Sequence, residues 1–116
     1  MDFKIIFLPV GYDIKDVNND NTDINVVLPN NKVYFGTLFT QKNIQVLMEK
    51  DEQIFFWSTD MVIVKDLSKS TIHKAIQELF DTNYLTHAFS EIGNISEVFA
   101  MYKSFEAVPY IDLSIV

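Results

Sequence analysis

Two apolar runs separated by an asparagine pair constrain the fold of this chain more than any other feature. Residues 24–29 and 32–39 are rich in Val, Ile, Leu and Phe, and Asn30-Asn31 lies between them. Asn tolerates the positive φ that a tight type I′ turn requires, and apolar runs on both sides of such a pair are typical of a hairpin. The sequence therefore predicts an antiparallel hairpin with a type I′ turn.

Three further segments are predicted to be strands. Residues 3–8 form a short apolar run, and residues 110–116 alternate apolar and polar side chains. Residues 54–57 and 61–65 are predicted to form one strand with a bend at Ser58-Thr59-Asp60. Because its second half is continuously apolar, we expect Met61–Val64 to be covered on both faces, as in the middle of a sheet.

Apolar residues three and four positions apart predict helices between these strands. The predicted helices are residues 41–50 with Thr40 as N-cap, a longer helix that begins at Ser68 or Ser70, a short helix after residue 83 that ends at Gly93, and a run from Asn94 to Tyr102 opened by an Asn94–Glu97 capping box. The whole chain, residues 1–116, is therefore expected to be one α+β domain. It should contain about five mostly antiparallel strands, with three or four helices packed on one face.

Charge narrows the range of functions. The chain has nine Lys, no Arg and sixteen acidic residues, a net charge of −7, of which −4 belongs to residues 81–116. Arg is the residue that reads phosphates and guanine edges in a bidentate manner, so direct binding of nucleic acid is not expected. The last third of the chain is instead expected to supply an acidic face that attracts a basic partner.

The expected location is the cytoplasm. Cys is absent, which fits a reducing compartment. The N-terminal residues lack the pattern of a secretory signal peptide, and no apolar run reaches the ~18 residues of a membrane span. We therefore expect no interaction with a membrane.

Neither a metal site nor a cofactor is predicted. Asp16, Asn18, Asp20 and Thr22 alternate as in a calcium-binding loop, but Val27 occupies the twelfth position, where a bidentate Glu is needed. Residues 13–23 are therefore expected to form a solvated loop. The three glycines are isolated, so no phosphate-cradling loop is expected.

No catalytic residue is predicted, and the chain is not expected to be an enzyme. His73 and His87 are fourteen residues apart, and neither has a carboxylate at the offset typical of a zinc site or a general base. A small hydrolase that uses one of these histidines is the least favoured interpretation.

Part of the chain resembles a known group of proteins. The segments Tyr34 to Thr40 and Phe56 to Val64, with Asn43-Ile44, Leu47-Met48 and Asp66-Leu67-Ser68, resemble small bacterial proteins similar to the immunity proteins of toxin–immunity systems. The resemblance covers about residues 34–80. It implies a small, acidic α+β domain without an active site, and it carries no catalytic residue over to this chain.

The expected function is that of an immunity or inhibitor protein, which neutralises a cognate protein such as a basic toxin or nuclease through an acidic surface. Phe56 and Trp57 should point to opposite sides of a strand, which leaves one of them for the core and the other for a helix, a partner or solvent. The predicted contact residues are Trp57, Asp60, Glu91, Glu97, Tyr102 and Glu106. A monomer and a homodimer both stay open. The alternative is an anti-defence protein of a phage or mobile element, whose carboxylates imitate nucleic acid.

Overall fold

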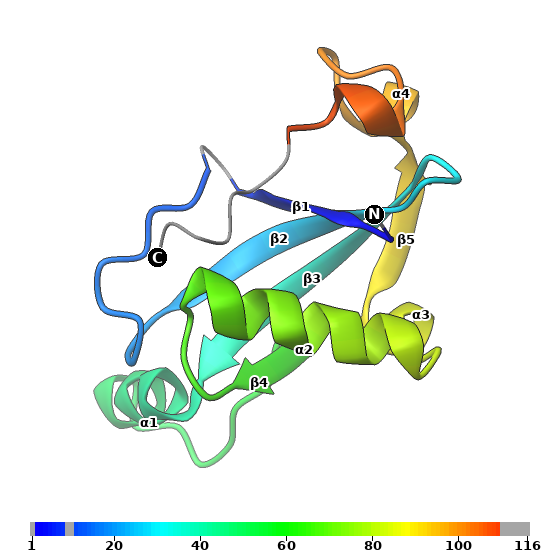
Figure 1. Cartoon of the computed structure of the whole chain (residues 1–116). Coiled ribbons are helices and arrows are strands. Elements are labelled where there is room, and N and C mark those ends of the chain that lie inside the picture. The colour runs from blue at the N-terminus through cyan, green and yellow to red at the C-terminus, as the bar shows by residue number, and fades with distance from the viewer. Residues whose placement is uncertain (1, 9–10, 110–116) are drawn as a thin grey trace.

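The computed structural model of this chain describes residues 2–8 and 11–109. Within them the elements are β1 (Lys4–Phe7), β2 (Asn21–Val27), β3 (Lys32–Thr40), α1 (Gln41–Lys50), β4 (Met61–Val64), α2 (Lys69–Asp81), α3 (Leu85–Ala88), β5 (Ser90–Asn94), α4 (Ile95–Val98) and the 3₁₀ turn η1 (Phe105–Ala107) (Figure 1). A mixed five-stranded sheet with helices confirms the predicted α+β class. The strand predicted over residues 110–116 lies outside the described residues.

β3 is the central strand of the sheet. β2 pairs antiparallel along one side of β3, and β1 pairs antiparallel with β2. On the other side of β3, β4 pairs in parallel with residues 37–40 and β5 pairs antiparallel with residues 32–35. Because β4 and β5 share that side of β3, they lie end to end, and Gly36 faces the junction between them.

The β2–β3 hairpin is confirmed, but its turn is not of type I′. Asn31 N–H donates to Leu28 O (2.9 Å), which closes a β-turn with Pro29 at its second position. Asn31 has a φ of 71°, whereas Asn30 is not among the residues with positive φ. A type I′ turn needs positive φ at both central residues, and Pro29 is fixed near −65°. The loop is therefore an ordinary turn followed by one left-handed asparagine.

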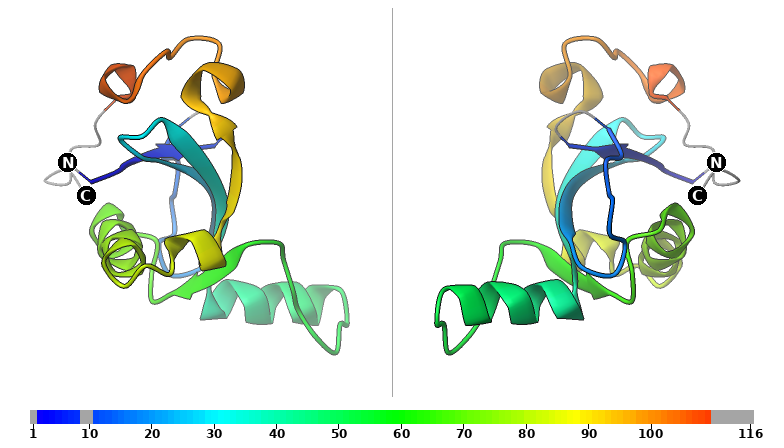
Figure 2. Two further views of the ribbon diagram at one scale, coloured as in Figure 1. Left: turned by 90° about the vertical axis from the view of Figure 1, so that its right-hand side faces the viewer. Right: turned by 90° about the vertical axis from the view of Figure 1, so that its left-hand side faces the viewer.

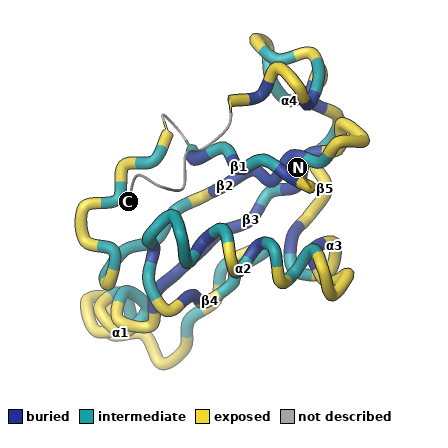
Figure 3. The backbone as a smooth tube through the Cα atoms, in the orientation of Figure 1, coloured by how far each residue is buried: buried dark blue, intermediate teal, exposed yellow. Residues whose placement is uncertain are grey.

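The main core lies between α2 and one face of the sheet. Ser68 Oγ accepts a hydrogen bond from Thr71 N–H (3.2 Å) and so begins α2 where the sequence predicts it. Ile72 and Ile76 on the inner side of this helix are fully buried, and they belong to the same cluster as the sheet residues Ile24, Val26 and Leu38 (Figure 3). This cluster also includes Leu85 and Phe89 from the segment after α2.

A second, smaller core lies on the opposite face at one end of the sheet. Side chains alternate along a strand, so Val27 points away from the face that carries Val26. Val27 and Val33 are buried there with Ile95, Phe105 and Val108 from the C-terminal segment. Figure 2 shows α4 and the chain that follows it at this end of the molecule.

Two predicted strand assignments are wrong. Residues 54–57 form an irregular loop, and only residues 61–64 pair with β3. Met61–Val64 is not a central strand either, because β4 lies at the edge of the sheet and Ile63 is 52% exposed. A continuous run of four apolar residues does not show whether the strand has one neighbouring strand or two.

Three predicted boundaries also change. Residues 90–94 form β5 instead of the end of a helix, because the free side of β3 at residues 32–35 supplies a hydrogen-bonding partner. The helix predicted to run to Tyr102 ends at Val98. The polar loop predicted over residues 13–23 ends earlier, since β2 begins at Asn21.

Candidate partner-binding surface

The crossover from β3 to β4, which contains α1 and the loop of residues 51–60, projects beyond the end of the sheet (Figures 1 and 2). α1 begins as predicted, with Thr40 Oγ1 accepting a hydrogen bond from Asn43 N–H (3.2 Å). None of its residues is buried, although Ile44, Leu47 and Met48 form the expected apolar stripe. α1 therefore adds surface to the molecule and contributes little to the core.

Residues 54–57 carry the most exposed group of large apolar side chains in the described part of the chain. Ile54 is 94% exposed, Phe55 63% and Trp57 70%. Phe56 turns inward, and its ring packs edge-on against Phe39 with centroids 5.0 Å apart. Such a ring pair contributes about 0.5–1.5 kcal/mol beyond the area that it buries. Phe56 thus anchors the loop and Trp57 faces solvent, although the regular strand from which their separation was predicted is absent.

Asp60 fixes the point where the loop meets the sheet. Its carbonyl oxygen accepts a hydrogen bond from Thr37 N–H (3.0 Å), and its Oδ1 accepts one from Ser90 Oγ (2.7 Å). Asp60 has a φ of 53°, a left-handed conformation that Asp tolerates better than most residues. The strand predicted to bend at this position begins only after it, at Met61, and the Asp60 side chain joins the start of β4 to the start of β5.

The outer edge of β4 presents unpaired backbone groups. The carbonyl of Asp60 faces β3, and backbone groups face alternate sides along a strand paired in parallel. The N–H and C=O groups of Met61 and Ile63 therefore face away from β3. No strand among the described residues pairs with this edge. An edge of this kind can accept an extended segment of another chain.

The crossover is also acidic. Residues 41–60, which make up the crossover, contain four carboxylates and two lysines, a net charge of −2 out of −7 for the whole chain. Asp66 follows β4 and lies outside the crossover. Hydrogen bonds from the hydroxyl and the backbone N–H of Ser68 (N to Oδ1, 2.9 Å) hold the pKa of Asp66 below its ordinary value, so this carboxylate keeps its charge. Asp51 and Glu52 precede the exposed apolar side chains of the loop in the chain, and Asp60 follows them; we name these three carboxylates the acidic rim.

The six contact residues predicted from the sequence are not brought together. Trp57 and Asp60 lie in the crossover at one end of the molecule, whereas α4 and the chain after it lie at the opposite end (Figure 2). That end holds Glu97, Tyr102 and Glu106, and Glu91 is in β5. One surface cannot contain all six, and their roles as contacts stay predictions.

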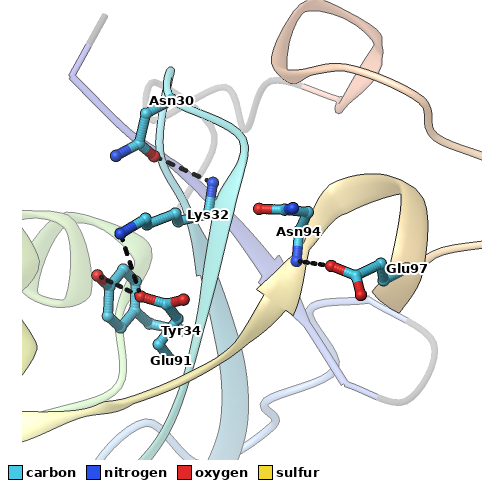
Figure 4. A network of polar contacts seen from close by, with 6 residues as sticks. All are labelled: Asn30, Lys32, Tyr34, Glu91, Asn94 and Glu97. Atoms are coloured by element: carbon cyan, nitrogen blue, oxygen red, sulfur yellow. Dashed lines mark hydrogen bonds and ion pairs between the residues drawn. The ribbon is translucent and has the colours of Figure 1, made fainter.

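Like Asp60, Glu91 and Glu97 have structural partners (Figure 4). Glu91 Oε1 accepts a hydrogen bond from the Tyr34 hydroxyl and lies near Lys32 Nζ, each at 3.5 Å. Burial, followed by the nearby Glu91 carboxylate, raises the pKa of Tyr34. Glu97 Oε1 accepts a hydrogen bond from Asn94 N–H (3.0 Å), which confirms the predicted capping interaction.

Neither histidine has the partner that a general base needs. The ring of His73 lies 5.1 Å from that of Phe3, and the ring of His87 lies 5.8 Å from that of Tyr84, centroid to centroid. Within residues 2–8 and 11–109, no hydrogen bond joins either imidazole to a carboxylate. The orienting group of a catalytic base is therefore missing from the described geometry.

Carboxylates in the acidic loop before β2 accept hydrogen bonds from nearby backbone groups. Asp16 Oδ1 accepts a hydrogen bond from Asn18 N–H (3.0 Å), and Asp20 Oδ1 accepts one from Asn21 N–H (2.8 Å). Across the part of the chain that the structure describes, no three His, Cys, Asp or Glu residues are arranged to hold a metal ion.

The exposure of Ile54, Phe55 and Ile63 was not predicted from the sequence. Each was assigned to a strand, where an apolar side chain is usually covered. The polar residues Asp51 to Gln53 could have indicated the exposure of residues 54–57. They separate these residues from α1 and so place them in a connecting loop, which usually lies on the surface.

No family model, curated protein or solved structure matches this chain. The resemblance to immunity proteins therefore stays a prediction. None of the helices described here is long and apolar enough to cross a bilayer.

Proposed function

We propose that this chain is a protein-binding protein of immunity or inhibitor type, which neutralises a cognate protein partner. Its contact is the crossover surface, which we define as Ile54, Phe55, Trp57 and Ile63 with the acidic residues Asp51, Glu52 and Asp60. The observation that carries this proposal is the exposure of these four apolar side chains. Exposed clusters of this kind mark binding sites, and Trp is enriched among residues that dominate binding energy.

The acidic rim of the crossover surface favours a basic partner. Carboxylates around an apolar centre resemble the anatomy of transient interfaces, which have an apolar core and a polar rim. Opposite charge speeds association and disfavours wrong partners, particularly at low salt. We place this interaction in the cytoplasm, in keeping with the absence of cysteine.

The edge of β4 supplies a means of specific recognition. The outward backbone groups of Met61 and Ile63 can pair with an extended segment of the partner, while Ile63 and Trp57 supply side-chain contacts. This is strand addition, in which backbone hydrogen bonds give affinity and side chains give specificity. Two neighbouring features thus support the same surface.

The experiment is co-expression of this chain with the product of its neighbouring gene, followed by co-purification and a growth assay. We expect a complex that protects the host from toxicity. Trp57→Ala should weaken the complex by at least about tenfold, because truncating a central aromatic residue typically costs 2 kcal/mol or more. Tyr84→Ala is the matched control, since it removes another exposed aromatic side chain (60% against 70% for Trp57) from the turn between α2 and α3.

The outcomes separate the surface from the function. Absence of both complex and rescue would contradict the proposed function. A complex that loses no affinity in Trp57→Ala would retain the function but reject the crossover surface. Competition with DNA for the partner, abolished by salt, would instead favour a protein that imitates nucleic acid.

A further inference from the structure

The C-terminal segment of residues 95–108, which we name the strap, is attached to the sheet differently from the other elements. It contains one four-residue helix and one three-residue 3₁₀ turn. Its buried residues Ile95, Phe105 and Val108 belong to the second core, and none belongs to the main core beneath α2. The strap therefore has its own hydrophobic contacts with the sheet.

A single ammonium group holds the end of the strap. Lys4 Nζ donates to Phe105 O (2.7 Å) and to Val108 O (2.8 Å), and it lies 4.5 Å from the centre of the Phe105 ring. Lys4 is in β1, more than a hundred residues earlier in the chain. Among the described residues, its ammonium makes no ion pair with a carboxylate. Its charge is thus satisfied by the carbonyl oxygens of the strap.

A second residue holds both ends of the strap. Asn31 O accepts a hydrogen bond from Ile95 N–H (2.9 Å), and Asn31 Oδ1 accepts one from Phe105 N–H (3.2 Å). This is the asparagine with positive φ in the turn between β2 and β3. The hairpin turn therefore provides the anchor point, and its side chain reaches the same segment that Lys4 holds.

We infer that the strap opens and closes as a unit independent of the main core, and that the Lys4 ammonium is its latch. Segments with few buried contacts and few backbone bonds to the rest of a protein open at lower free energy than its core. Opening uncovers an apolar floor formed by Ile6, Val27 and Val33. It also displaces three of the predicted contact residues, because Glu97, Tyr102 and Glu106 all lie in the strap.

Limited trypsin digestion of the full chain, read by mass spectrometry, tests this inference. Lys103 lies in the strap and reports its opening, whereas Lys74 lies in α2 and reports unfolding of the main core. When opening and closing are fast, cleavage follows the population of the open form. In the wild-type chain we expect cleavage after Lys103 to be at least about tenfold faster than after Lys74.

Variants then separate the two processes. Lys4→Met keeps the aliphatic stem but removes the ammonium, and cleavage after Lys103 should rise by about 10- to 100-fold, the range for hydrogen bonds to a charged group. Asn31→Gly suits the positive φ and removes only the side-chain anchor, so a rise of about 2- to 12-fold is expected. Lys65→Met removes an exposed lysine elsewhere and should leave cleavage after Lys103 unchanged.

Ile24→Val in the main core is the decisive control. If the strap opens independently, this variant raises cleavage after Lys74 by about 2- to 12-fold and leaves cleavage after Lys103 unchanged, because the closed and open forms lose the same contact. Equal increases at both lysines would show that the strap opens only with the whole domain, which overturns the inference. Unchanged cleavage after Lys103 in Lys4→Met would reject Lys4 as the latch.

Discussion

Gly36→Ala tests how closely the Phe89 ring packs against β3, at the junction of β4 and β5. A Cβ atom at Gly36 would lie 2.3 Å from Phe89 Cε1, 2.4 Å from Cδ1 and 2.7 Å from Cζ. Carbon atoms prefer separations near 3.5–4.0 Å, so the ring or the strand must move. Phe89 is only 2% exposed, and its ring has little room for such a movement.

The test depends on whether Gly36→Ala raises or lowers the free energy of unfolding. Gly36 has no positive φ, so in open space an alanine would stabilise the domain by about 0.4–1 kcal/mol through the unfolded state. Overpacking a core costs about 1–3 kcal/mol. The contact with Phe89 should therefore reverse the sign, and we expect a net loss of about 1–2 kcal/mol in the free energy of unfolding.

Urea denaturation at 25 °C measures this loss as a lower midpoint with an unchanged slope. Phe89→Leu removes the ring, so Gly36→Ala made in that background should be neutral or stabilising. A Gly36→Ala variant as stable as the wild type would refute the reasoning. So would an equal loss in both backgrounds, because the two changes would then be independent.

Three further changes have defined outcomes. Asp66→Asn should destabilise the domain near neutral pH, and the difference in the free energy of unfolding from the wild type should vanish as the pH falls through the lowered pKa of Asp66. Urea titrations from about pH 7 to pH 2 measure this difference, and a difference that does not change with pH contradicts the prediction. Thr40→Ala should cost about 1 kcal/mol by removing the cap of Asn43 N–H, whereas Thr40→Ser retains the cap and should cost less. Trp57→Ala should change the free energy of unfolding by less than about 0.5 kcal/mol, because that side chain is mostly exposed; a larger loss would mean that Trp57 is part of the core.

Elements with local signals were predictable from the sequence. The hairpin follows from two apolar runs and a turn at Asn30-Asn31, and α2 follows from the Ser68 cap with Ile72 and Ile76 on one side. Each of these signals lies within a few residues of the structure that it specifies. Tertiary packing supports them without changing their type.

Elements that depend on distant partners were not predictable. Residues 90–94 satisfy a helical spacing as well as a strand, and they become β5 only because β3 has a free side at residues 32–35. β4 lies at the edge of the sheet because no described strand pairs with its outer side, which depends on the fold and not on the apolar run itself. Sequence pattern alone cannot order the strands of a sheet.

The candidate site was predicted in part. Phe56 is packed and Trp57 is exposed, but they lie in a loop, so the strand alternation used to predict their separation is not its cause. The strap was not predicted, because Lys4 and Phe105 are far apart in the chain and only the fold brings them into contact. For the same reason, the acidic residues of the last third could not be assigned to a separate end of the molecule.

Hydrogen exchange of this chain, with and without the product of its neighbouring gene, tests the central claim most directly. The crossover surface predicts that the partner slows amide exchange most strongly within residues 54–63, including the outward amides of Met61 and Ile63. Protection confined to the strap or to α2, with residues 54–63 unchanged, would contradict the assignment of this surface.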